Sequence, residues 1–254
     1  MNIKYTLLGF LLLFIVWSLS VYFELLGLTL LAPPSEVLHS LILALSDNAQ
    51  KGEKVFEHLV FTLNRTFQGW LLASFIGVII GLIVSINKKI ELTLEPIFEF
   101  FRSIPPILAF PLFLVAFNYG NDAYIWTIFF GSLPIMILTI TKNIKLISKE
   151  KIQILKIYKT DNFIYFSSMA MEILPSILLG LRLTFSISLI IAIVTEMVMT
   201  PQNGWALGAL ARDAEMNFDT PLFYASVIAI GTIGFLINLL LKYLESWISG
   251  DKNI

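Results

Sequence analysis

The chain has 254 residues, of which 57% are hydrophobic and 14% are charged, and its formal net charge is −1. A soluble domain of this length needs far more polar surface, so the composition excludes an ordinary soluble protein and indicates a membrane protein. The net charge points to no particular partner, and we expect none made of nucleic acid. The absence of cysteine excludes disulfides and thiolate metal sites.

Six apolar stretches approach or exceed the roughly 20 residues that cross the hydrocarbon core of a bilayer. In chain order they cover residues 5–28, 66–86, 104–118, 123–141, 177–199 and 221–242. The first has no small-residue cleavage site, so we interpret it as a retained signal-anchor helix. The pattern predicts an all-α integral membrane protein with six transmembrane helices.

The lysine and arginine residues are divided unevenly between the two sides of these spans. Of the 17 such residues, 13 fall on the side of the N-terminus, and the other side holds only Lys51, Lys54, Arg65 and Arg212. The positive-inside rule therefore places both termini in the cytoplasm. It also places there the segment 141–163, "TKNIKLISKEKIQILKIYKTDNF", which is the most lysine-rich part of the chain.

The outer side is expected to hold the segments 29–65 and 200–220 and a tight turn at 118–123. In the first of them, Pro33 and Pro34 stop one element, and Ser35 is expected to cap a short helix. That helix is apolar on one side, so we expect it to lie along the outer membrane surface.

The second span carries small residues at every fourth position, Ala73, Gly77 and Gly81. Such a stripe lets another helix backbone approach closely. We favour packing within one chain over a contact between subunits.

The third span contains three prolines. Pro105 and Pro106 are expected in its first turn, where the missing amide donors would be unsatisfied in any case. Pro111 is expected in the interior, where it removes the hydrogen bond to the carbonyl of Ile107 and kinks the helix. Neighbouring helices or a water-lined cavity must then satisfy that carbonyl. A pathway-lining role and an ordinary membrane proline are equally open.

The chain lacks the residue groups that catalysis requires. His39 and His58 are both expected on the outer side and have no metal-ligand spacing, and no glycine is followed by lysine, so there is no phosphate-binding loop. We expect no catalytic residues, no metal and no cofactor.

Glu196, in "IIAIVTEMV", is expected near the outer end of the fifth span. A carboxylate at this depth faces the bundle interior or water, or is held near the interface. It could cap a neighbouring helix, pair with a base or line an exit, and we favour a structural ion pair or hydrogen bond.

Within the lysine-rich segment, residues 149–160 have one polar and one apolar helix face. Such a helix could rest on anionic lipid headgroups or dock a cytoplasmic partner. The periodicity leaves both alternatives open.

The segment that follows, 172–198, reads "EILPSILLGLRLTFSISLIIAIVTEMV", with Leu-Pro at 174–175 and Gly-Leu-Arg at 180–182. Together with "APPSEVL" (32–38), "TLNRTFQGWLLASFIGVIIGLIVS" (62–85) and "FRSIPPILAFPLFLVAFNYG" (101–120), it resembles the permease subunits of binding-protein-dependent ABC importers. The chain is most similar to the branch that carries nitrate, sulfonates and taurine. The resemblance runs from Leu31 to about Trp247.

The resemblance implies a type I importer permease fold. It implies an anchor helix with an outer segment (1–56), a transmembrane core (57–247) with a cytoplasmic coupling loop at 142–176, and a short tail (248–254). The family's motif positions fall on Pro105, Pro106, Pro111, Pro175, Gly180, Arg182 and Glu196. Its short coupling helix, which contacts the ATPase, falls on Tyr158, Lys159, Thr160, Asp161, Asn162, Phe163, Ile164, Tyr165 and Phe166. The family's Glu-Ala-Ala and glycine are replaced here by Ile-Gln-Ile at 152–154 and by Tyr158.

The resemblance also implies the partners. ATP is bound by a cytoplasmic ATPase dimer, a second copy of this permease completes the pathway, and an extracytoplasmic binding protein delivers the solute to the cell membrane. The solute class would be nitrate, sulfonate, taurine, bicarbonate or a thiamine precursor. The alternative is an ATP-independent secondary transporter or channel. Such proteins often have ionisable residues at the membrane midplane or inverted repeats, and the sequence shows neither.

Overall fold

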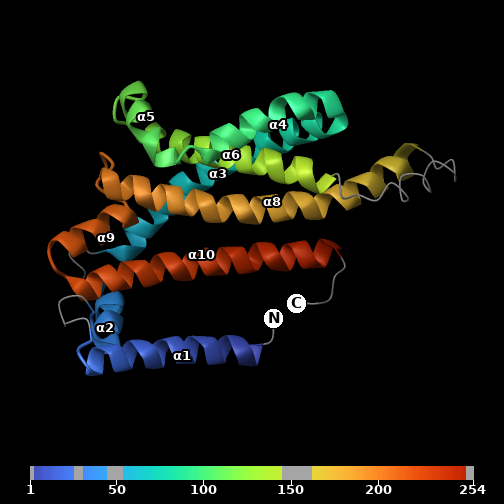
Figure 1. Cartoon of the computed structure of the whole chain (residues 1–254). Helices are drawn as coiled ribbons and strands as arrows, with labels where there is room; N and C mark the ends of the chain where they lie inside the picture. The colour runs from blue at the N-terminus through green and yellow to red at the C-terminus, as the bar shows by residue number, and fades with distance from the viewer. Residues whose placement is uncertain (1–2, 26–30, 45–53, 145–161, 250–254) are drawn as a thin grey trace. The chain divides into compact units, whose positions relative to one another are not determined.

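The structure, a computed structural model, describes residues 3–25, 31–44, 54–144 and 162–249. Within these ranges every regular element is a helix, which confirms the predicted all-α class (Figure 1). The helices are α1 (Ile3–Tyr22), α2 (Pro34–Ala44), α3 (Val55–Ile86), α4 (Lys88–Ser103), the 3-10 helix η1 (Pro106–Leu108), α5 (Phe110–Ala116), α6 (Asp122–Ile144), α8 (Asn162–Val198), α9 (Leu207–Met216) and α10 (Thr220–Ser249).

Five of the described helices are long and apolar enough to cross a membrane: α1, α3, α6, α8 from Ile173 onward, and α10. They correspond to five of the six predicted spans. The remaining candidate is a bent pair, in which Lys88–Ser103 and Pro106–Ala116 meet at 76°.

The expectation of one kinked helix over 104–118 was wrong. The chain bends before Pro106, which begins η1, and Pro111 stands in the first turn of α5 rather than in a helix interior. The amides of Leu112 and Phe113 both donate to the carbonyl of Ala109, so the helix starts afresh there. At that position the missing amide of Pro111 breaks no helical hydrogen bond.

Three helix boundaries also differ from the expected ones. Helix α3 begins at Val55, 11 residues before the expected start of the span, so Arg65 lies inside a helix. Helix α8 begins at Asn162, so the second half of the expected coupling loop is helical. Helix α2 begins at Pro34, so Ser35 is not its cap; the carbonyl of Pro33 accepts the amides of Glu36 and Val37 instead.

The chain divides into two compact units, and the first comprises residues 1–65, 192–235 and 253–254. In it, α2 lies between α1 and the start of α10, where Val37 packs with Ala225 and Trp17. The indole of Trp17 donates to the carbonyl of Ala32 (3.1 Å). A second core of this unit joins α9 to α3 and α10 through residues that include Val55, Leu207, Leu210 and Leu222.

The second unit comprises residues 66–191 and 236–252. Here α4 and α5 both pack on α6, and Figure 1 shows α4 running along it. Glycines on α3 allow it to contact α6 closely: a Cβ added to Gly77 or Gly81 would lie 2.7 Å from the Cβ of Met136 or 2.8 Å from that of Ile140. Ala73, on the same stripe, is fully buried.

Candidate functional site

A buried ion pair links α3 and α8 in the first unit. Nη1 of Arg65 lies 2.8 Å from Oε1 of Glu196, and the two side chains are 1% and 0% exposed. Charges are retained in such surroundings only where they are paired and hydrogen-bonded. The other carboxylate oxygen, Oε2, accepts the hydroxyl of Thr62 (2.8 Å) and the amide of Gly208 (3.1 Å), so both oxygens of Glu196 are used.

The same residues complete the N-terminus of α9. Its N-cap, Ala206, has no side chain that could accept a hydrogen bond, so the free amides need partners from elsewhere. The amide of Ala206 donates to Nδ1 of His58 (2.9 Å) and that of Leu207 to the hydroxyl of Thr62 (2.9 Å), while Gly208 uses Glu196. The negative charge of Glu196 also complements the positive end of the helix dipole.

Helix α9 lies directly against α8 at this point. A Cβ on Gly208 would collide with the carbonyl oxygen of Ile193, so only glycine permits the approach that brings its amide to Glu196. Buried hydrogen bonds and close backbone contact together fix α9 to α3 and α8.

The ion pair also orders the loop that leads into α9. Nη2 of Arg65 donates to Oδ1 of Asn203 (3.0 Å), and the same oxygen accepts the amide of Trp205 (3.1 Å). Between these two residues Gly204 adopts φ of +76°, a left-handed conformation that glycine reaches without strain.

A pocket of about 350 Å³ lies beside this cluster. His58, Asn203, Gly204, Trp205, Ala209, Leu210 and Asp213 line it. His58 is 5% exposed, and its ring meets that of Trp205 edge to face at 4.9 Å. The Nε2 atom of His58 has no hydrogen-bond partner among the described residues.

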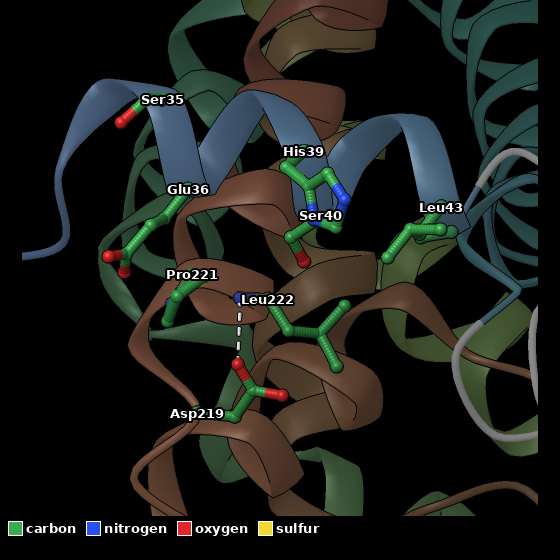
Figure 2. A pocket seen from close by; sticks show the side chains of 9 residues that line it. Ser35, Glu36, His39, Ser40, Leu43, Asp219, Pro221 and Leu222 are labelled. Carbon is green, nitrogen blue, oxygen red and sulfur yellow. Dashed lines mark hydrogen bonds between the residues drawn. The ribbon is translucent and has the colours of Figure 1, made fainter.

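A second pocket of the first unit, about 440 Å³, lies between α2 and the start of α10 (Figure 2). Glu36 and His39 line it from α2, and Asp219 lines it from the other side. The carboxylate of Asp219 accepts the amide of Leu222 (3.1 Å), as the dashed line in Figure 2 shows, and so acts as a cap of α10.

Among the residues singled out from the sequence, Glu196 forms two of the three arrangements considered for it, an ion pair with a base and a hydrogen bond to a helix N-terminus. Its partners Thr62 and Arg65 were not predicted to meet it, and His58, which accepts the amide of Ala206, was not predicted to lie beside them. Their spacing contained a signal, because residues 58, 62 and 65 stand at i, i+4 and i+7 and share one face of a helix. Ending the outer segment at Arg65 concealed that pattern.

The other motif residues lie in the second unit. A Cβ on Gly180 would meet the sulfur of Met136 at 2.7 Å, and Arg182 pairs with Glu245 of α10 at 3.0 Å. Pro175 lies within α8. Of the residues expected to contact an ATPase, 158–161 lie outside the described residues, and 162–166 are in the first turns of α8.

No group of three or more histidine, aspartate or glutamate side chains within the described ranges is placed to hold a metal ion.

Comparison with known proteins places the chain among transport components. A family model described as "Binding-protein-dependent transport system inner membrane component" matches residues 73–250. The bicarbonate transport system permease protein CmpB of Synechococcus elongatus is 27% identical over 95% of this chain and 87% of its own length. The nitrate import permease protein NrtB of Leptolyngbya laminosa is 24% identical over 78% of this chain and 70% of its own length. The taurine transport system permease protein TauC of Escherichia coli is 22% identical over 91% of this chain and 83% of its own length.

The fold resembles that of a solved transporter. A chain of the MetNI methionine ABC transporter, in an inward-facing conformation, superposes with a TM-score of 0.62 at 17% sequence identity. The similarity covers 76% of this chain and 94% of that one.

Proposed function

Because the chain belongs to the binding-protein-dependent transport system inner membrane component family, we propose that it conducts a small oxyanion, or a small solute carrying an oxyanion group, in an importer driven by a separate ATPase. The chain itself is a multi-pass membrane protein and the permease subunit of an ABC importer of the nitrate, bicarbonate, sulfonate and taurine type.

The solute class rests on what the similar permeases are named for. Bicarbonate, nitrate, sulfonates and taurine differ in size and net charge, but each has a group in which several oxygen atoms share negative charge. The similarity extends over 95% of this chain for the bicarbonate permease, so it does not depend on one motif.

The partners follow from the same family. Two copies of the permease would form the pathway, an ATPase dimer would bind to the cytoplasmic segment around 158–166, and a binding protein would deliver the solute on the opposite side. ATP binding closes the ATPase pair, and the attached segments move the helices between inward-facing and outward-facing packings. Such a transition needs only ligands that prefer one packing to the other.

Uptake by reconstituted protein tests this function. The permease is placed in proteoliposomes together with its ATPase and binding-protein partners, and uptake of radiolabelled bicarbonate, nitrate and taurine is measured. We expect uptake of at least one of them, and only with ATP and the ATPase present. Uptake driven by an ion gradient without ATP would instead identify a secondary transporter.

The coupling segment has its own test. Replacing Tyr158 and Phe163 together with alanine should abolish uptake while the protein remains in the membrane. Co-purification of the ATPase is measured in parallel and should be lost. Unchanged uptake would remove the segment from the mechanism.

A further inference from the structure

His58, on α3, is a buried side chain with one nitrogen in use and the other free. Its Nδ1 lies 2.9 Å from both the amide nitrogen and the carbonyl oxygen of Ala206. That carbonyl already accepts the amide of Leu210 (3.0 Å). The buried amide of Ala206 needs an acceptor, and Nδ1 of His58 is that acceptor. The nitrogen Nδ1 is therefore the acceptor, and in the neutral ring the proton is on Nε2.

The free nitrogen is thus a hydrogen-bond donor in a side chain that is 5% exposed and lines the 350 Å³ pocket. Leaving a buried donor unused is costly, and such groups in native proteins usually have a partner. The Nε2 donor of His58 therefore suits a ligand that supplies a hydrogen-bond acceptor.

Two other lining residues add donors. The Oδ1 atom of Asn203 accepts from Arg65 and from the amide of Trp205, which fixes the orientation of its side-chain amide. The Nδ2 group of Asn203 therefore remains as a donor, and the bond from the arginine strengthens it by polarisation. The indole of Trp205 can only donate.

The charges around the pocket do not oppose an anion. Asp213 is the acidic lining residue, and its Oδ1 accepts from Nε and Nη2 of Arg212 at 2.9 and 2.6 Å. Glu196 is neutralised by Arg65. The lining therefore offers N–H donors, and the carboxylates near His58 are paired with cations, Asp213 with Arg212 and Glu57 with Lys54 (3.5 Å).

From these contacts we propose that the pocket formed by His58, Asn203 and Trp205 binds the oxyanion group of the transported solute within the permease. This inference rests on the proposed function, because it takes the solute to be an oxyanion. It adds a site at which the permease itself recognises the solute.

Direct binding tests it without the binding protein. The permease–ATPase complex is placed in nanodiscs, and binding of radiolabelled nitrate, bicarbonate and taurine is measured by equilibrium dialysis with chloride as competitor. We expect saturable binding of at least one of the three that chloride does not displace.

Two substitutions remove donors with little change of shape. His58→Asn keeps an acceptor for the amide of Ala206 and removes the Nε2 donor, and Trp205→Phe keeps the ring stacked on Phe61 (6.3 Å between centroids). Each is expected to weaken binding by about tenfold or more, the size of a hydrogen bond to a charged group. His39→Asn, on α2, is the matched control and should bind as the wild type does.

Absence of saturable binding in the wild type, or wild-type affinity in His58→Asn, would overturn the inference. Uptake by proteoliposomes that contain the same complex, with the binding protein added, separates this result from failure of the proposed function. Wild-type protein that imports an oxyanion but binds none in the pocket rejects the pocket alone. A complex that imports none of the three solutes rejects the function.

Discussion

Arg65 of α3 and Glu196 of α8 form an ion pair of 2.8 Å between side chains that are almost completely shielded from solvent, although 131 residues separate them in the chain. Around this pair are the hydroxyl of Thr62, the first amides of α9 and the loop at Asn203. One buried charge pair thus determines where three segments of the first unit meet.

Breaking this pair should be strongly destabilising. Arg65→Met leaves Glu196 buried without its counter-charge, and we expect a loss of about 3–5 kcal/mol in the free energy of unfolding. The measurement is denaturant or thermal unfolding of the protein in nanodiscs. A change below about 1 kcal/mol, the size expected of a surface pair, would show that the charge of Glu196 is not compensated by Arg65.

An exposed ion pair provides the contrast. Lys142 of α6 lies 2.7 Å from Glu99 of α4, with the side chains 52% and 32% exposed. Since solvent screens such pairs, Lys142→Met should change the stability by less than about 1 kcal/mol, measured as for Arg65→Met. Glu99 also keeps its contact with Arg102 (2.7 Å) in this variant. A loss as large as that of Arg65→Met would contradict the distinction between buried and exposed pairs.

The hydroxyl of Thr62 should hold the first turn of α9 in place. It donates to Glu196 and accepts the amide of Leu207, so Thr62→Val removes both contacts with almost no change in shape. We expect a loss of about 1–3 kcal/mol, because a buried amide and a carboxylate oxygen lose a partner. Faster hydrogen exchange at Leu207 in the variant is the local readout, and Thr62→Ser is the matched control. Equal exchange in Thr62→Val and the wild type would contradict the contact.

Adding a single methyl group to the glycine stripe of α3 should lower the stability of the protein. In Gly77→Ala the new Cβ would lie 2.7 Å from the Cβ of Met136, an atom close to the backbone that cannot swing aside. We expect a cost of about 1–3 kcal/mol from overpacking, measured by thermal unfolding. Gly231→Ala on α10 is the control, since no atom lies within 4 Å of its added Cβ. Equal stability of the two variants would argue against close packing of α3 on α6.

The sequence alone predicted the fold class and the family, and the comparisons confirm both. The spans at 66–86, 123–141 and 177–199 were found because long apolar runs are a direct consequence of the thickness of a bilayer. What lies between the spans was predicted less well. The amphipathic helix α4 was missed, because charged residues interrupt its apolar pattern, and the first turns of α3 were assigned to an outer segment.

The candidate site was predicted only in part, for a physical reason. Hydropathy identifies Glu196 as a costly residue in an apolar run, so a partner for it had to exist. The sequence does not show which base lies near it, because the contact joins two helices and depends on the tertiary fold. The pocket at His58 depends in addition on Gly204 and Gly208, whose backbone conformation and close approach appear only in the folded chain.

Transport by the assembled complex tests the central claim most directly. Proteoliposomes with permease, ATPase and binding protein are loaded with ATP or with a non-hydrolysable analogue, and the initial rate of nitrate, bicarbonate and taurine uptake is compared. We expect at least one of these solutes to accumulate in proteoliposomes loaded with ATP, and none to accumulate with the analogue or when the ATPase is omitted. Equal uptake with and without the ATPase would contradict it.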